Sequence, residues 1–229
     1  MGYQSVSIIS NGSRIKRKWM EKYGKSLDIL GVSCDTTDLN INFDHGRRIA
    51  GSAFPRDDTK KTRECAILAK EFGIHFKINT VVTSKNVDED MSQFINELDP
   101  MRWKIFQVLD VEGENYNSKT KGNDINQFLI SDKNFDDYVK RNKEGLIRKE
   151  ILMAENNSTM RNSYILIDEY GRFLDSSKGG KTPTKSILDV GLEEAVNELL
   201  INEGKGFDKS LFEIRGGYYP EKWTRTSIK

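Results

Sequence analysis

Four polar side chains in two predicted strands are the residues best suited to bind an anion. Lys77 and Asn79 lie two positions apart in H-F-K-I-N-T-V-V, and Arg102 and Lys104 repeat that spacing in R-W-K-I-F-Q. Because side chains alternate between the two faces of a strand, each pair shares one face. Strands buried on both faces of a parallel sheet are nearly continuous in Val, Ile and Leu. The two pairs therefore predict a sheet face that is lined by cations.

A cation-lined face inside a protein requires an anionic partner. A buried ammonium or guanidinium group without a partner is costly, and a phosphate chain satisfies both its charge and its hydrogen-bonding geometry. The alternative is that Lys77 and Arg102 lie at the entrances of their strands and reach water. Arg47 in D-H-G-R-R and Arg215 in I-R-G-G-Y-Y are further candidates for an anion site, although isolated arginines in loops are usually solvated.

Small polar residues follow two other predicted strands. Ser10-Asn11-Gly12 and Ser33-Cys34-Asp35 stand at carboxyl ends of strands, where α/β folds bind their ligands. Asn11 and Asp35 are also residues that form turns and cap helices. Both a ligand-binding and a structural role stay open for them.

The chain has two cysteines, Cys34 and Cys65, and two histidines, His45 and His75. The cysteines follow neither a zinc spacing nor the C-x₃-C-x₂-C spacing of an iron–sulfur site, so they are predicted to be core thiols of a protein in a reducing compartment. The histidines are too few and too far apart to suggest a metal site. No metal ligand is predicted.

The elements that position these residues alternate between strands and helices. Three strand-then-helix units followed by a strand predict a parallel sheet with right-handed crossovers, wound as a barrel or as an open doubly wound sheet. The predicted strands cover residues 5–12, 27–34, 75–82 and 102–109, and the predicted helices 13–23, 59–72 and 87–98. Gly73 is expected just past the second helix, and Asn86 with Glu89 is expected to cap the third. A long polar loop is expected between Asp35 and Asp58.

The second half of the chain has a different pattern. A helix is predicted near residues 132–142, and no element is assigned to residues 143–162. Alternating apolar residues around E-Y-G predict a hairpin over 163–175. A short apolar segment, 186–190, precedes an amphipathic helix over 192–201.

Composition excludes several classes of protein. The 229 residues include 36 Lys plus Arg against 35 Asp plus Glu, so no overall basic field indicates nucleic-acid binding. No apolar run reaches the length of a membrane span, and the first residues lack the pattern of a signal peptide. The sequence predicts a soluble, cytoplasmic protein without a membrane anchor in these residues.

Segments along nearly the whole chain resemble the viperin-like radical S-adenosylmethionine enzymes, an antiviral nucleotide dehydratase family. The resemblance is carried by S-V-S-I-I-S-N-G-S (5–13), L-D-I-L-G-V-S-C-D (27–35), F-K-I-N (76–79), N-V-D-E-D-M (86–91), R-W-K-I-F-Q (102–107), E-G-E-N (112–115), S-Y-I-L-I-D-E-Y (163–170), K-S-I-L-D-V-G (185–191) and R-G-G (215–217). It implies an incomplete (β/α)₆ partial barrel of about four parallel strands with helices, plus a C-terminal extension with a hairpin. The barrel part is expected over 1–115 and the extension over 116–229, as one structural unit.

The resemblance also implies a reaction and its participants. Enzymes of this family hold a 4Fe–4S cluster on three cysteines, cleave S-adenosylmethionine, and dehydrate CTP to 3′-deoxy-3′,4′-didehydro-CTP. By motif match, the residues similar to S-adenosylmethionine ligands are Asn11, Ser33, Arg47 and Val81. Those similar to ligands of CTP or a related nucleoside triphosphate are Lys77, Asn79, Arg102, Lys104, Lys181 and Arg215. Tyr164 looks like the tyrosine near the nucleotide sugar and is the catalytic candidate.

The chain departs from the family pattern in four places. The cysteine loop and the Gly-Gly-Glu-Pro strand are absent, so the chain as given is not expected to bind the cluster. It is expected to be either an N-terminally truncated copy of an active dehydratase or a non-catalytic nucleotide-binding or interaction protein. A longer D-H-G-R-R loop leaves Arg47 and Arg48 as alternatives. The anchor that places members at the endoplasmic reticulum or lipid droplets is missing, and Trp223 is the best match to the tryptophan that contacts a cluster-delivery partner.

Overall fold

The computed structural model describes residues 5–49, 54–109, 124–160, 165–175, 181–201 and 210. The chain divides into two compact units. The described residues of the first unit fall within 1–108 and 130–155, and those of the second within 109–129 and 156–219. The domain boundary predicted between residues 115 and 116 lies outside the described residues.

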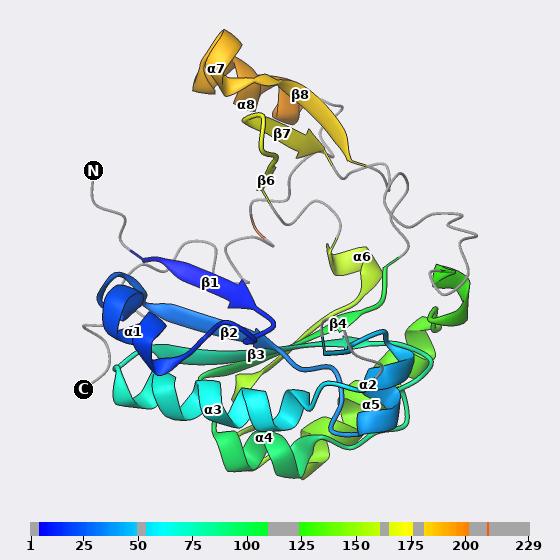
Figure 1. Cartoon of the computed structure of the whole chain (residues 1–229). Coiled ribbons are helices and arrows are strands. Elements are labelled where there is room, and N and C mark those ends of the chain that lie inside the picture. The colour runs from blue at the N-terminus through cyan, green and yellow to red at the C-terminus, as the bar shows by residue number, and fades with distance from the viewer. Residues whose placement is uncertain are drawn as a thin grey trace. The chain divides into compact units, whose positions relative to one another are not determined.

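The first unit is built on a parallel sheet of five strands (Figure 1). The strands are β1 (Ser7–Ser10), β2 (Ile29–Ser33), β3 (His75–Val82), β4 (Arg102–Gln107) and β5 (Leu152–Glu155). Their order in the sheet follows their order in the chain, and every neighbouring pair is parallel. A doubly wound sheet reverses its strand order at a switch point, whereas a barrel does not. Of the two architectures left open by the sequence, the structure has the barrel-like one.

Helices pack on one face of this sheet. They are α1 (Arg17–Tyr23), α3 (Asp58–Glu71), α4 (Ser92–Leu98) and α5 (Asp132–Gly145), with short 3₁₀ turns η1 (Gly24–Ser26) and η3 (Lys149–Ile151), while α2 (Leu39–Asp44) lies in the connection between β2 and α3. Figure 1 shows α3 and α4 beneath the sheet. Leu30, Ile78 and Trp103 of the strands form one core cluster with Leu68 of α3 and Tyr138 of α5. Burial of such side chains contributes about 1.5–3 kcal/mol each and holds the sheet on its helices.

Two local predictions in this unit are wrong, for different reasons. Asn86 does not cap a helix: its Nδ2 donates to the carbonyls of Asp35 (2.6 Å) and Val81 (3.0 Å), and α4 begins only at Ser92. The expected polar loop after Asp35 contains α2, and the first backbone N–H groups of this helix donate hydrogen bonds to the side chain of Asp38. At Asn86 a contact distant in sequence decides the conformation of the chain, whereas at α2 a local N-cap that was not predicted does.

The second unit contains a three-stranded antiparallel sheet. Its elements are η2 (Ile125–Gln127), α6 (Asn157–Met160), β6 (Leu166–Ile167), β7 (Arg172–Asp175), β8 (Thr182–Ser186), α7 (Ile187–Val190) and α8 (Leu192–Ile201). The predicted hairpin is confirmed as β6–β7, and Asp168 accepts the backbone N–H groups of Tyr170 and Arg172 in its turn. Phe173, Ala195 and Leu199 form the core of this unit.

None of the helices in the described ranges combines the length and the apolar character that a membrane span requires.

Candidate functional site

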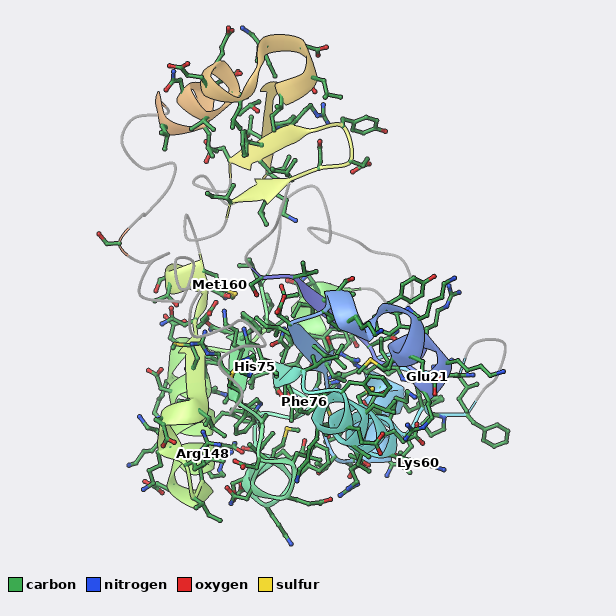
Figure 2. The ribbon with its side chains drawn as sticks, turned by 90° about the vertical axis from the view of Figure 1, so that its left-hand side faces the viewer. Glu21, Lys60, His75, Phe76, Arg148 and Met160 are labelled. Carbon is green, nitrogen blue, oxygen red and sulfur yellow. The ribbon has the colours of Figure 1, made fainter. Side chains whose placement is uncertain are left out.

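The four polar side chains of β3 and β4 lie on the sheet face opposite the core cluster. Lys77 is in register with Arg102, and Asn79 with Lys104. Side chains along β3 alternate between half-buried and buried. The first two residues of the strand, labelled in Figure 2, show this alternation: His75 is half-buried and Phe76 is buried in the core. We call the other face the polar face, and define it by Ser33, Lys77, Asn79, Arg102, Lys104 and Glu155.

The cations of the polar face are crowded. Burial and the neighbouring charges of Arg102 and Lys104 lower the pKa of Lys77 to about 8. Burial also lowers the pKa of Arg102, against the attraction of Glu155. Three positive side chains on adjacent strand positions therefore favour an anion over water as their neighbour.

Lys104 has a carboxylate partner. Its Nζ lies 2.7 Å from Oε1 of Glu155, and 15% of the Lys104 side chain is exposed against 1% for Glu155. Glu155 ends β5, opposite Phe106 of β4. Glu155 was not predicted as a site residue, because residues 143–162 show no pattern that assigns them to an element.

Asn79 contributes an acceptor to the same face. Its Oδ1 is buried and has no hydrogen-bond partner among the described residues. Buried polar atoms are almost always paired, so such an atom is a site where a ligand can donate a hydrogen bond. Ser33 of β2 lies next to it in register and is half-buried.

The residues predicted to contact S-adenosylmethionine lie near the carboxyl edge of the sheet. Ser33 ends β2, Val81 is the last residue but one of β3, and Asn11 follows β1. Asn11 is exposed, and its Oδ1 accepts the backbone N–H of Ser13 at 3.0 Å, which is the turn role that the sequence left open. The backbone N–H of Val81 donates to Oδ1 of Asp35 at 2.9 Å.

Arg47 and Arg48 have different surroundings. Arg47 pairs with Asp35 and with Asp58, whose Oδ2 lies 3.3 Å from Nη1, and Asp58 also pairs with Arg56. Burial opposes the charge of Arg47, but the two carboxylates outweigh it and raise its pKa. Arg48 instead stacks on the ring of Phe43, 4.1 Å from its centroid. The structure therefore brings Arg47, and not Arg48, to the end of β2.

Both cysteines are core thiols, as predicted. Cys34 and Cys65 are fully buried and unbridged. Burial raises the pKa of Cys34 to about 12 and that of Cys65 to about 11. Within the described ranges, no three His, Cys, Asp or Glu side chains are grouped to hold a metal ion.

The remaining predicted site residues lie elsewhere. Lys181 is half-buried beside β8 in the second unit. Tyr164 and Arg215 fall outside the described residues.

Comparison with known proteins identifies the family. No family model matches the chain. It is 43% identical over 225 residues to an S-adenosylmethionine-dependent nucleotide dehydratase of Oncorhynchus mykiss, with 98% of this chain and 60% of the relative covered. Proteins of the same name are 42% identical in Danio rerio, over 98% of this chain and 58% of the relative, and 35% identical in Flammeovirga pacifica, over 90% and 66%. The chain belongs to the viperin-like S-adenosylmethionine-dependent nucleotide dehydratase family. It spans about three-fifths of the length of the first two of these relatives.

Solved structures show that this nucleotide dehydratase family member has the radical S-adenosylmethionine fold. The chain aligns with native anSMEcpe with bound AdoMet and Cp18Cys peptide at a TM-score of 0.60, with 14% identity over 91% of this chain and 60% of that one. It aligns with Streptococcus suis SuiB bound to S-adenosylmethionine at 0.52, with 16% identity over 92% and 49%. The predicted fold class is confirmed, with five parallel strands in place of about four.

Proposed function

We propose that the polar face binds the phosphate chain of a nucleoside triphosphate, and that this nucleotide is CTP, which complete enzymes of the family dehydrate to 3′-deoxy-3′,4′-didehydro-CTP in antiviral defence. One observation carries this proposal: Lys77, Arg102 and Lys104 lie side by side on one face of the sheet. A triphosphate matches three neighbouring cations in charge and in hydrogen-bonding capacity. The Oδ1 of Asn79, which has no hydrogen-bond partner within the described part of the chain, supports a ligand that also donates hydrogen bonds, as a nucleoside does.

S-adenosylmethionine is the cofactor we propose for the carboxyl edge, with Asn11, Ser33, Arg47 and Val81 nearby. Among these residues, Arg47 is the cation that would bind the carboxylate group of S-adenosylmethionine. Its guanidinium group also pairs with Asp35 and Asp58. The roles of Lys181, Arg215 and Tyr164 in nucleotide binding stay predictions.

The iron–sulfur cluster does not fit the residues of this chain. Three thiolates are needed, and the sequence has two cysteines, both buried with raised pKa values. These 229 residues therefore do not supply the ligands of a cluster. This observation favours a second function for the chain by itself, namely nucleotide binding without catalysis. A cluster-delivery partner and a cytoplasmic location stay predictions.

Calorimetric titration with CTP, cytidine and inorganic tripolyphosphate tests the phosphate site. CTP and tripolyphosphate are expected to bind, and cytidine to bind at least tenfold more weakly. Arg102→Met removes a charge-assisted bond worth about 1.5–3 kcal/mol, which is roughly a 10- to 100-fold loss of CTP affinity. Lys133→Met, on the exposed surface of α5, is the matched control. Equal affinities for CTP and cytidine in the parent protein would contradict the proposal.

A further inference from the structure

The ion pair between Lys104 and Glu155 is asymmetric. The lysine side chain is 15% exposed and the glutamate side chain 1%, while their charged atoms are 2.7 Å apart. The ammonium group therefore lies on the accessible side of the pair and the carboxylate behind it. A ligand that approaches the polar face meets Lys104 before it meets Glu155.

Glu155 stands next to the anion site that we propose above. Phe106, its neighbour in register, is two positions from Lys104 on β4, so the carboxylate lies one step beyond the cations toward the carboxyl edge. A buried ion is costly without a partner, and Glu155 supplies one to Lys104 when no ligand is bound. An ammonium group has three donors, so Lys104 can contact this carboxylate and a phosphate oxygen together.

We propose that Glu155 is a specificity-determining residue: an internal counter-anion that satisfies Lys104 in the ligand-free protein and repels a phosphate that arrives there. This inference rests on the proposed nucleotide site. Orthophosphate or sulfate meets the same repulsion as a triphosphate but engages fewer cations. A polyphosphate overcomes the repulsion because it also reaches Lys77 and Arg102. Glu155 thus sets a threshold that excludes abundant small anions and admits nucleoside polyphosphates.

The test is Glu155→Gln, which removes the charge and keeps the shape. The melting temperature of the ligand-free variant is expected to fall, because the half-buried ammonium of Lys104 loses the negative charge beside it. Its affinity for tripolyphosphate is expected to rise roughly tenfold at low salt, since a charge within a few ångströms of the ligand is removed. Orthophosphate binding is expected to be below the detection limit in the parent protein and to become measurable in the variant. Asp137→Asn breaks the exposed pair with Lys133 and should change neither quantity.

The two measurements separate this inference from other roles of Glu155. A residue that only supports the fold, or that itself binds the ligand, would lower the melting temperature and the affinity together, and that result would overturn the inference. An unchanged affinity would overturn it as well. If the glutamine variant does not fold, Glu155→Asp keeps the charge, withdraws it by one methylene group, and should show the same opposed changes on a smaller scale. Failure of the parent protein to bind either CTP or tripolyphosphate would instead count against the proposed function.

Discussion

The side chain of Lys77 lies in surroundings that disfavour its positively charged form. Burial and two cationic neighbours lower its pKa to about 8, so the folded protein binds a proton there less readily than the unfolded chain, whose lysine has an ordinary pKa of about 10.5. The unfolded state then holds more protons between these two values, and stability increases as the pH rises through them. Below pH 8 the charged lysine costs the folded state on the order of 1–2 kcal/mol, after a discount for its partial exposure.

Replacing this lysine should therefore have opposite effects on stability and on binding. Lys77→Met is expected to raise the melting temperature of the ligand-free protein at neutral pH and to weaken its binding of CTP. In the parent protein, CTP affinity should fall as the pH rises past about 8, and binding near that pH should take up a proton. Calorimetry in two buffers of different ionisation enthalpy measures the uptake. A variant that loses both stability and affinity would show that Lys77 is not under this electrostatic stress.

The same residues show how far the sequence predicts a site. Alternation along a strand is a local property, so the shared face of Lys77 with Asn79, and of Arg102 with Lys104, could be predicted from spacing alone. The partner of Lys104 could not be predicted. Glu155 ends a strand of four residues, L-M-A-E, whose pattern is too short to distinguish from a loop, and its pairing depends on the register of β5 with β4.

At the level of elements, the loop between β2 and α3 is tied to the sheet by charges. Arg47 pairs with Asp35 at the end of β2 and with Asp58 at the start of α3. Asp35 also accepts the backbone N–H of Val81 in β3. The network therefore fixes the carboxyl edge of two strands and the beginning of a helix together.

Removal of Arg47 should destabilise the fold far more than removal of its neighbour. Arg47→Met leaves the buried carboxylate of Asp35 without its cation, so the free energy of unfolding is expected to fall by about 2–4 kcal/mol. Arg48→Met, in contrast, removes only a stacking contact at an exposed side chain, and the expected change is below about 1 kcal/mol. Urea unfolding of the two variants measures the difference. Similar losses would mean that the network contributes no more than a surface contact.

The first and last residues of helices and strands were harder to predict from the sequence than the presence of these elements. The strand His75–Val82 and the helix Leu192–Ile201 have the predicted bounds, because each has a clear period. The start of α4 was predicted from the capping preference of Asn86, but this side chain is used by the carbonyls of Asp35 and Val81. Capping preference is a local tendency, and contacts made by the folded chain override it.

At the level of the whole molecule, the chain carries a cation-rich face without the thiols of a cluster. It is expected to retain no 4Fe–4S cluster after anaerobic incubation with iron and sulfide, because neither buried thiol ionises readily. Electron paramagnetic resonance of the reduced protein and iron analysis check this result. The double variant Cys34→Ser, Cys65→Ser should give the same iron content and the same electron paramagnetic resonance spectrum as the parent protein. A cluster signal that disappears in the double variant would contradict the expectation.

The three neighbouring cations of the polar face also have a consequence for handling the protein. Polyphosphates carried over from a preparation, such as tripolyphosphate or a bound nucleotide, are rivals of added CTP, since they reach the same three side chains, whereas orthophosphate and sulfate engage fewer of them. Material that retains a polyphosphate would resist heat better than material freed of it, and would respond less to added CTP. Removal of polyphosphates during purification thus decides whether an assay reports on an empty or an occupied protein.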